Sequence, residues 1–312
     1  MAAGLCLVRS SAVLAESATA LRCPLGCGPL RPDEETLRDN RFGLDYEVRI
    51  AWCSTCGLGV TLDPPSDEEL AELYEREYPD EGRVPGTSRA ARVWHAVNGS
   101  LPLVDRVCEG PVLDVGCHTG ETLIALRARG LEVVGLEPNP RAAERARARG
   151  LEVLSAPIEE ADLPARHFRS VVLSQVLEHV RDPTTVLAAT REALAPGGTA
   201  FVVVPNAESA WRRLFGRHWA HWHVPFHLYH HTERSLRKLL GQSGFGIRRL
   251  ETMTPGESVL LSVDAWRNAR RGRYEVEPFE GRYARRLLIA PPARLLDALG
   301  RGDALYAEVA PD

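Results

Sequence analysis

The chain has 312 residues, of which 44% are hydrophobic, so it can bury one large core and a small additional module. This composition excludes a disordered protein. A formal charge of −4 provides no global attraction to nucleic acid or to an anionic membrane. Chemistry on a small molecule is therefore the default expectation.

The amino-terminal residues 1–19 are predicted to be disordered. Their short apolar run, 12–15, is preceded by Arg9 and closed by Glu16, so it does not resemble a secretory signal. No segment reaches the length of a membrane span. These features predict a cytoplasmic protein.

Four of the seven cysteines form two knuckles about 25 residues apart: Cys23, Cys27, Cys53 and Cys56. Four thiolates in a tetrahedral array are the ligands of a closed structural zinc site. The spacing predicts a zinc ribbon over 20–62 with a structural zinc ion. The alternatives are four buried or free cysteines, or a ribbon that binds nucleic acid.

Residues 63–110 are predicted to be a helical linker or lid. Pro64, Pro65 and the acids 67–69 indicate a helix start, and the polar, glycine-containing stretch 79–88 is typical of a hinge. Tyr78 is a candidate for closing over a ligand. Tyr74 and Tyr78 at i and i+4 are more simply explained as one packed helix face.

Residues 111–123 combine a buried strand, an acid and a glycine-containing turn before a helix. Asp114 lies at the carboxyl end of the strand, and Gly116 and Gly120 allow the backbone to approach a ligand. The spacing is not the dinucleotide fingerprint, because His118 stands at its middle glycine. Glycine is required only where φ is positive or the cofactor is touched, so we expect His118 to be tolerated.

Three further motifs follow in order. Glu137 ends the next apolar strand, where an acid can accept hydrogen bonds from both hydroxyls of a ribose. Residues 168–183 contain a strand that ends at Ser174, then Glu178 and His179, with a helix expected from Asp182. Residues 194–198 indicate a helix stop before a buried strand over 199–206.

These motifs resemble the class I S-adenosylmethionine-dependent methyltransferases, and the resemblance covers roughly 88–312. It implies an α/β fold with a Rossmann-like seven-stranded sheet over 111–312, in which the last strand, 304–310, is antiparallel. It also implies S-adenosylmethionine as the cofactor. The cofactor-binding residues that it implies are Asp114, Gly116, Cys117, Gly120, Glu137 and Ser174.

Residues 207–231 lie where methyltransferases insert substrate-recognition elements, and they contain six histidines and three tryptophans. Residues 225–232 resemble a P-x-H-L-Y-H-F-T motif of bacterial methyltransferases, in which the histidine near the active site corresponds to His227, while His231 replaces a phenylalanine. His179 and His227 are the candidate general bases. A metal on His218, His221 and His223 is not favoured, because their spacing matches no zinc motif.

A second insertion, 255–303, is rich in arginine. Interleaved acids favour a solvated helical surface over contact with a phosphate or a membrane. Residues 232–244 predict an amphipathic helix, and 245–250 predict the sixth strand.

The sequence thus predicts methyl transfer to a small molecule such as a sugar, a natural product or a lipid precursor. The alternative is a non-catalytic binding or scaffold protein with a vestigial cofactor pocket. The motifs do not favour a nucleic acid as a partner. They do not specify the substrate, the methylated atom or the oligomeric state.

Overall fold

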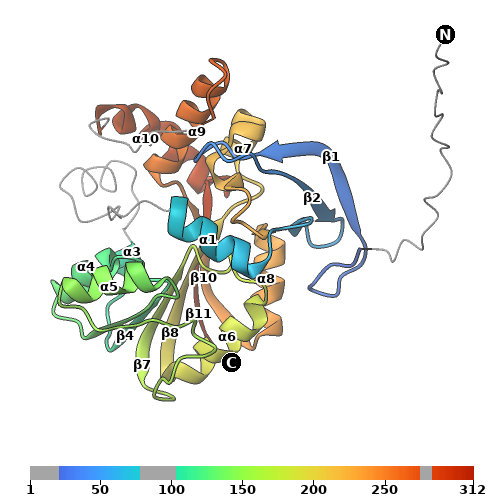
Figure 1. Ribbon diagram of the computed structural model, residues 1–312. Coiled ribbons are helices and arrows are strands. Elements are labelled where there is room, and N and C mark those ends of the chain that lie inside the picture. The colour runs from blue at the N-terminus through green and yellow to red at the C-terminus, as the bar shows by residue number, and fades with distance from the viewer. Residues whose placement is uncertain (1–20, 78–102, 275–282) are drawn as a thin grey trace, which may run out of the picture.

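A computed structural model describes residues 21–77, 103–274 and 283–312 (Figure 1). The predicted amino-terminal disorder, the hinge over 79–88 and Tyr78 lie outside the described residues. The largest element is a seven-stranded sheet in the order β10-β11-β8-β7-β4-β5-β6. Its strands are β4 (Val112–Val115), β5 (Val133–Leu136), β6 (Val153–Leu154), β7 (Phe168–Ser174), β8 (Leu194–Pro205), β10 (Phe245–Met253) and β11 (Ala304–Pro311).

Strands β4 to β8 pair in parallel, and β11 runs antiparallel between β8 and β10. This confirms the predicted seven-stranded sheet and its antiparallel last strand. All four residues of β4 are buried, as expected for a parallel strand covered on both faces. The carboxyl ends of β4, β5 and β7 therefore meet at one edge of the sheet, where open α/β sheets bind ligands.

Helices cover both faces of this sheet (Figure 1). On one side lie α3 (Leu103–Arg106), α4 (Glu121–Arg127) and α5 (Pro140–Ala148), and on the other lie α6 (Pro183–Ala193) and α8 (Glu233–Gln242). The side chains of Asn139, Asp182 and Thr232 cap α5, α6 and α8 by accepting hydrogen bonds from backbone N–H groups of the first turn. The helix starts predicted at Asp182 and Thr232 are thus present.

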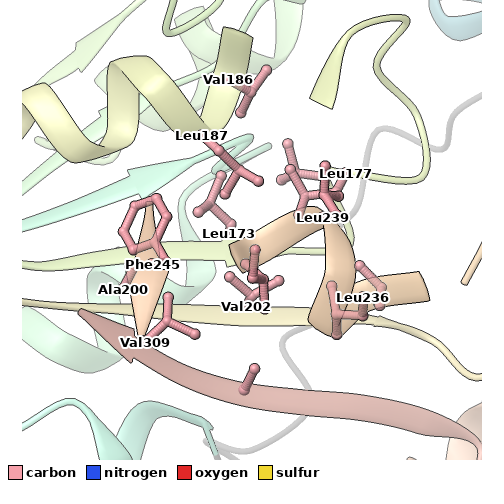
Figure 2. Close-up of a cluster of buried hydrophobic side chains, with 14 of the residues drawn as sticks. Leu173, Leu177, Val186, Leu187, Ala200, Val202, Leu236, Leu239, Phe245 and Val309 are labelled. Carbon is pink, nitrogen blue, oxygen red and sulfur yellow. The ribbon is translucent and has the colours of Figure 1, made fainter. Parts of the chain in front are cut away.

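The core between the sheet and α6 and α8 is aliphatic. Figure 2 shows Leu173 of β7, Leu187 of α6 and Leu239 of α8 in one buried cluster with Val202 of β8. Strand β8 begins at Leu194, five residues before the predicted start, and its pairing with β7 is irregular between Phe168 and Ser170. The predicted helix stop is therefore part of an irregular strand that follows α6 directly.

A second sheet has the order β1-β2-β3-β9 and contains β1 (Leu30–Arg38), β2 (Glu47–Cys53) and β3 (Gly59–Thr61). Its fourth strand, β9 (Tyr229–His230), comes from a point some 170 residues further along the chain. Beside this sheet lies α1 (Asp67–Glu77) (Figure 1). The amino-terminal sheet is therefore completed by the segment that precedes α8.

The two insertions form the upper part of the molecule in Figure 1. They contain α7 (Ala210–Phe215), the 3₁₀ helices η1 (Gly216–His218) and η2 (Ala220–Trp222), α9 (Gly256–Ala269) and α10 (Tyr283–Ala298). Within the described ranges, no helix is both long and apolar enough to cross a bilayer.

Candidate active site

The loop after β4 has the left-handed backbone that a tight ligand-binding turn requires. Gly116 has φ 71° and Gly120 has φ 84°. A Cβ on Gly120 would lie 2.1 Å from Leu151 Cδ1, so a side chain is excluded there on packing grounds as well. His118 also has positive φ, at 50°. The loop therefore accommodates histidine at this position, as expected, but in the left-handed conformation that favours glycine.

Cys117 contributes to this loop through its backbone. Its side chain is buried with Leu123 and Ala143, and its sulfur would lie 2.6 Å from a Cβ on Gly135. Burial, followed by the charges of Asp114 and Glu137, raises the pKa of the thiol. The thiol therefore has a packing role beneath the loop.

Glu137 ties the ends of β4 and β5 together. One carboxylate oxygen, Oε2, accepts a hydrogen bond from His118 N at 2.8 Å, and Oε1 accepts one from Asn139 N at 2.9 Å. Asp114 lies near it and is 3% exposed. Burial and the Glu137 charge raise the pKa of Asp114 to about 8. The two carboxyl groups predicted to bind the cofactor thus lie together at the sheet edge.

The turn after β7 approaches the same edge. A Cβ on Gly116 would lie 3.2 Å from Val176 Cγ2, and His179 N donates to Val176 O at 2.9 Å. Ser174 ends β7, as predicted, and Gln175 follows with φ 58°. This turn therefore packs against the cofactor loop at Val176 and leads on to His179 three residues later.

Glu178 is fully buried, and neither carboxylate oxygen has a hydrogen-bond partner among the described residues. Burial raises the pKa of this carboxyl to about 8. Its backbone carbonyl accepts hydrogen bonds from Leu228 N and Tyr229 N. Glu178 thus joins the turn after β7 to the segment that contains His227.

Three histidines form what we call the imidazole cluster: His179, His223 and His227. One ring nitrogen of each lies within 4.8 Å of the others. His227 Nδ1 lies 2.9 Å from the His221 carbonyl, and His223 Nδ1 lies 3.2 Å from His227 Nε2. The sequence placed His179 and His227 in the active site, but it did not predict that His223 joins them.

Hydrogen-bond direction assigns the protons of this cluster. A carbonyl only accepts, so the His221 contact places the proton of His227 on Nδ1 and leaves Nε2 to accept from His223. His179 Nδ1 lies 3.2 Å from the Phe226 carbonyl and 2.6 Å from Tyr74 Oη, which leaves its Nε2 lone pair available. Burial lowers the pKa of all three imidazoles, that of His179 to about 4.

Two residues of the candidate site carried no sequence signal for it. Tyr74, from α1, forms a hydrogen bond with His179 Nδ1 through its hydroxyl group, whereas its spacing from Tyr78 had indicated a packing role. Arg41, from the loop after β1, places Nη1 3.5 Å from His223 Nε2. Both come from the amino-terminal part of the chain, so only the tertiary structure brings them to the imidazole cluster.

The remaining histidines of the segment have separate surroundings. His221 Nε2 lies 3.3 Å from the buried carboxylate of Asp303, and His230 Nε2 lies 3.1 Å from Thr61 Oγ1. Within the described residues, His223 converges with His179 and His227 rather than with His218 and His221.

The four predicted zinc ligands converge at the end of the second sheet where β1 begins and β2 ends. All four Sγ atoms, those of Cys23, Cys27, Cys53 and Cys56, lie within 4.8 Å of one another. Cys23 Sγ is 3.6 Å from Cys56 Sγ. Burial opposes ionisation of Cys53, but hydrogen bonds from the backbone of Cys56 and Thr55 and from neighbouring thiols lower its pKa to about 7. Four converging thiols are the donor set that tetrahedral zinc prefers.

The sheet order, the glycine-containing loop after β4 and the acid after β5 together define a Rossmann-like α/β domain of the methyltransferase type. A model of the family described as "Methyltransferase domain" matches residues 73–250, which is more than half of the chain. The chain therefore belongs to this methyltransferase family.

Curated relatives match part of the chain. An uncharacterized protein of Mycobacterium tuberculosis (strain ATCC 25618 / H37Rv) is 31% identical over 147 residues, covering 47% of this chain and 50% of the relative. A ubiquinone biosynthesis O-methyltransferase of Hahella chejuensis is 37% identical over 102 residues, covering 30% and 43%. The chain thus spans about half the length, or less, of these relatives.

Solved structures share the fold. The cyclopropane synthase MmaA2 from Mycobacterium tuberculosis has a TM-score of 0.50 at 17% identity and covers 80% of this chain and 99% of its own. The [4+2]-cyclase SpnF has a TM-score of 0.50 at 18% identity and covers 80% and 97%. At these identities the likeness concerns the fold alone.

Proposed function

We propose that the protein transfers a methyl group from S-adenosylmethionine to a small molecule such as a sugar, a natural product or a lipid precursor. The observation that carries this proposal is the close packing of Val176 on Gly116, where a Cβ would lie 3.2 Å from Val176 Cγ2, because it sets the cofactor loop against the turn that leads to His179. A candidate base beside the methyl donor is the arrangement that methyl transfer to a protonated nucleophile requires.

The cofactor, when bound, supplies an electrophilic methyl group on a sulfonium. Asp114, Glu137, Ser174 and the backbone of the loop 116–120 are proposed to hold it, Glu137 through the ribose hydroxyls. The ring of Tyr74 and the buried imidazoles restrict the water around the acceptor.

We propose His179 as the general base and His227 as a positioning residue. Burial keeps the His179 ring neutral, and the hydrogen bonds of this ring within the described residues are made by Nδ1, so Nε2 is the nitrogen proposed to accept the proton. Both ring nitrogens of His227 already take part in hydrogen bonds, to His221 and His223. His227 is therefore proposed to fix the cluster rather than to accept the proton.

We also propose that the four cysteines hold one structural zinc ion. Glycine turns and backbone hydrogen bonds, such as Gly57 N to Cys53 O at 2.8 Å, shape each knuckle around the sulfur atoms. A closed site with four thiolates has no open position for a substrate, so zinc here would stabilise the fold and take no part in methyl transfer.

The test is calorimetric titration with S-adenosylhomocysteine, comparing Glu137→Gln with Glu144→Gln on the exposed side of α5. Loss of a charged hydrogen-bond acceptor costs about 1.5–3 kcal/mol, so Glu137→Gln should bind about ten- to a hundred-fold more weakly. Glu144→Gln should bind like the parent protein. Parent protein that does not bind this ligand would contradict the proposal.

A further inference from the structure

A groove of about 470 Å³ lies where β1 and the loop after it face α9 and η1, away from the cofactor loop. This volume is within the range of small-molecule sites. Its lining includes Arg38, Asn40, Arg217, Trp266, Arg270 and Tyr274. None of these residues belongs to the cofactor site or to the imidazole cluster.

The groove exposes two large aromatic rings. Trp266 is 37% exposed and Tyr274 is 44% exposed, and the Arg270 guanidinium carbon lies 3.9 Å from the centre of the Trp266 ring. Arg38 lies over Tyr274 at 5.9 Å. Exposed aromatic rings beside guanidinium groups offer a stacking surface for a planar ring, and stacking of a base on an aromatic side chain is worth about 1–3 kcal/mol.

Both carboxylates of the groove already have partners. Glu47 forms an ion pair with Arg38, and Asp39 is fully buried and accepts hydrogen bonds from the backbone N–H groups of the loop that follows it. Arg217 and Arg270 form no ion pair within the described part of the chain. Their guanidinium groups thus remain available for an anion, and guanidinium binds phosphate with two hydrogen bonds.

Two further acidic residues, Glu35 and Asp45, influence the pKa values of groove residues through their charges. Glu35 opposes the fall in the pKa of His218 that burial and Arg217 cause, and Asp45 contributes to the raised pKa of Arg38. Neither of them lines the groove. The side chains that a ligand would meet are therefore aromatic, cationic or neutral, apart from the two paired carboxylates.

The groove adjoins the candidate active site through one short loop. Asp39 and Asn40 line the groove, and the next residue, Arg41, reaches His223 of the imidazole cluster. Asn40 Nδ2 donates to the carbonyls of Arg217 and Trp219, both at 3.3 Å, and so holds the opposite wall. A molecule anchored in the groove would therefore have the imidazole cluster on the other side of this loop.

We propose that the groove binds a nucleoside diphosphate, which serves as the carrier portion of the methyl acceptor. The base stacks on Trp266 or Tyr274, and the phosphates bind Arg217 and Arg270. The role as carrier rests on the proposed function, whereas binding of the nucleoside diphosphate itself does not. The proposal narrows the acceptor to nucleotide-linked small molecules.

The experiment titrates the S-adenosylhomocysteine-loaded protein with UDP, dTDP, ADP, GDP and CDP, and with pyrophosphate, by calorimetry and tryptophan fluorescence. At least one diphosphate should bind saturably, and Arg270→Gln and Trp266→Ala should each weaken it about ten-fold or more. Arg267→Gln is the matched control, because Arg267 is an exposed arginine in the last turn of α9, next to Trp266, and does not line the groove.

Three results would overturn the proposal: no diphosphate binds, the two groove variants bind like the control, or pyrophosphate binds as tightly as the best nucleoside diphosphate. The last result would show that the rings do not contribute. If S-adenosylhomocysteine binds and the diphosphates do not, the groove assignment fails and the proposed function stands. Protein that binds neither would contradict both.

Discussion

The three rings of the imidazole cluster differ in the partners of their nitrogen atoms. Arg41 contacts His223, His223 contacts His227, and His227 contacts the His221 carbonyl, so this chain of contacts is complete with neutral rings. His179 lies at the edge of the chain and keeps one nitrogen available. Burial alone would make the three residues equivalent, and it is the direction of the hydrogen bonds that distinguishes them.

We expect the His179 ring to stay neutral down to about pH 5, because burial lowers its pKa to about 4. The measurement is a pH titration of the histidine ring signals by NMR, with the His179 signal assigned from its loss in His179→Gln. The urea-unfolded protein is the control, since its histidines should titrate near pH 6.5. A midpoint near 6.5 in the folded protein would contradict this prediction.

At the residue scale, local sequence was enough for the cofactor loop and not for its surroundings. Gly116 and Glu137 directly follow β4 and β5, and Gly120 directly precedes α4, so their places at the sheet edge follow from the pattern of elements. Arg41 and Tyr74 reach the imidazole cluster only through tertiary contacts. The left-handed backbone of His118 was not predicted, because non-glycine residues rarely adopt positive φ and the loop geometry alone determines where one does.

The segment from β9 to α8 connects the two sheets. Strand β9 pairs with β3, and Thr232, the N-cap of α8, donates its hydroxyl to Cys56 O at 2.8 Å. A Cβ on Gly57 would lie 2.9 Å from Thr232 Cγ2, so the second knuckle packs closely on this cap. His231 lies between β9 and Thr232 in the sequence. It is 1% exposed, and neither of its ring nitrogens has a hydrogen-bond partner among the described residues.

Replacing His231 by phenylalanine should stabilise the protein by about 1–3 kcal/mol, because it removes a buried polar ring without hydrogen bonds and keeps a ring of similar size. His230→Phe is the matched control. His230 Nε2 lies 3.1 Å from Thr61 Oγ1, so the same replacement at the neighbouring residue should destabilise the protein. Urea unfolding of the two variants and the parent protein measures both effects.

The gain from His231→Phe should grow as the pH falls. Burial lowers the pKa of His231 to about 4, whereas the unfolded chain takes up a proton near pH 6.5. The lowered pKa therefore costs stability between pH 6.5 and about 4, by about 1.4 kcal/mol per pH unit. Equal gains at pH 7.5 and pH 5.5 would contradict this account.

At the scale of elements, the predicted strands and helices were mostly correct, since each combines a periodic apolar pattern with a cap or turn. Strand β9 was missed, because two residues carry no periodicity. The early start of β8 was missed because glycine and proline normally indicate a break, and here they lie in an irregular strand. Neither of these features could be read without the partner strand.

At the scale of the whole molecule, the amino-terminal sheet and the methyltransferase sheet share a core and a chain segment. Cys23, Cys53 and Cys56 belong to the same buried cluster as Leu173 and Leu239. From the cysteine spacing, the sequence predicted a separate ribbon over 20–62. The cysteine spacing does not indicate that β9 completes the ribbon sheet, because pairing between strands far apart in the chain depends on tertiary packing.

Because of this shared core, loss of the proposed zinc ion should destabilise the whole protein in one transition. Structural zinc contributes several kcal/mol to folding, so chelation or Cys53→Ser should lower Tm by about 10 °C or more. Cys108→Ser, at an exposed cysteine outside the cluster, should leave Tm and metal content unchanged. Calorimetry distinguishes the outcomes, because two separate transitions after metal removal would show that the ribbon folds independently of the methyltransferase sheet.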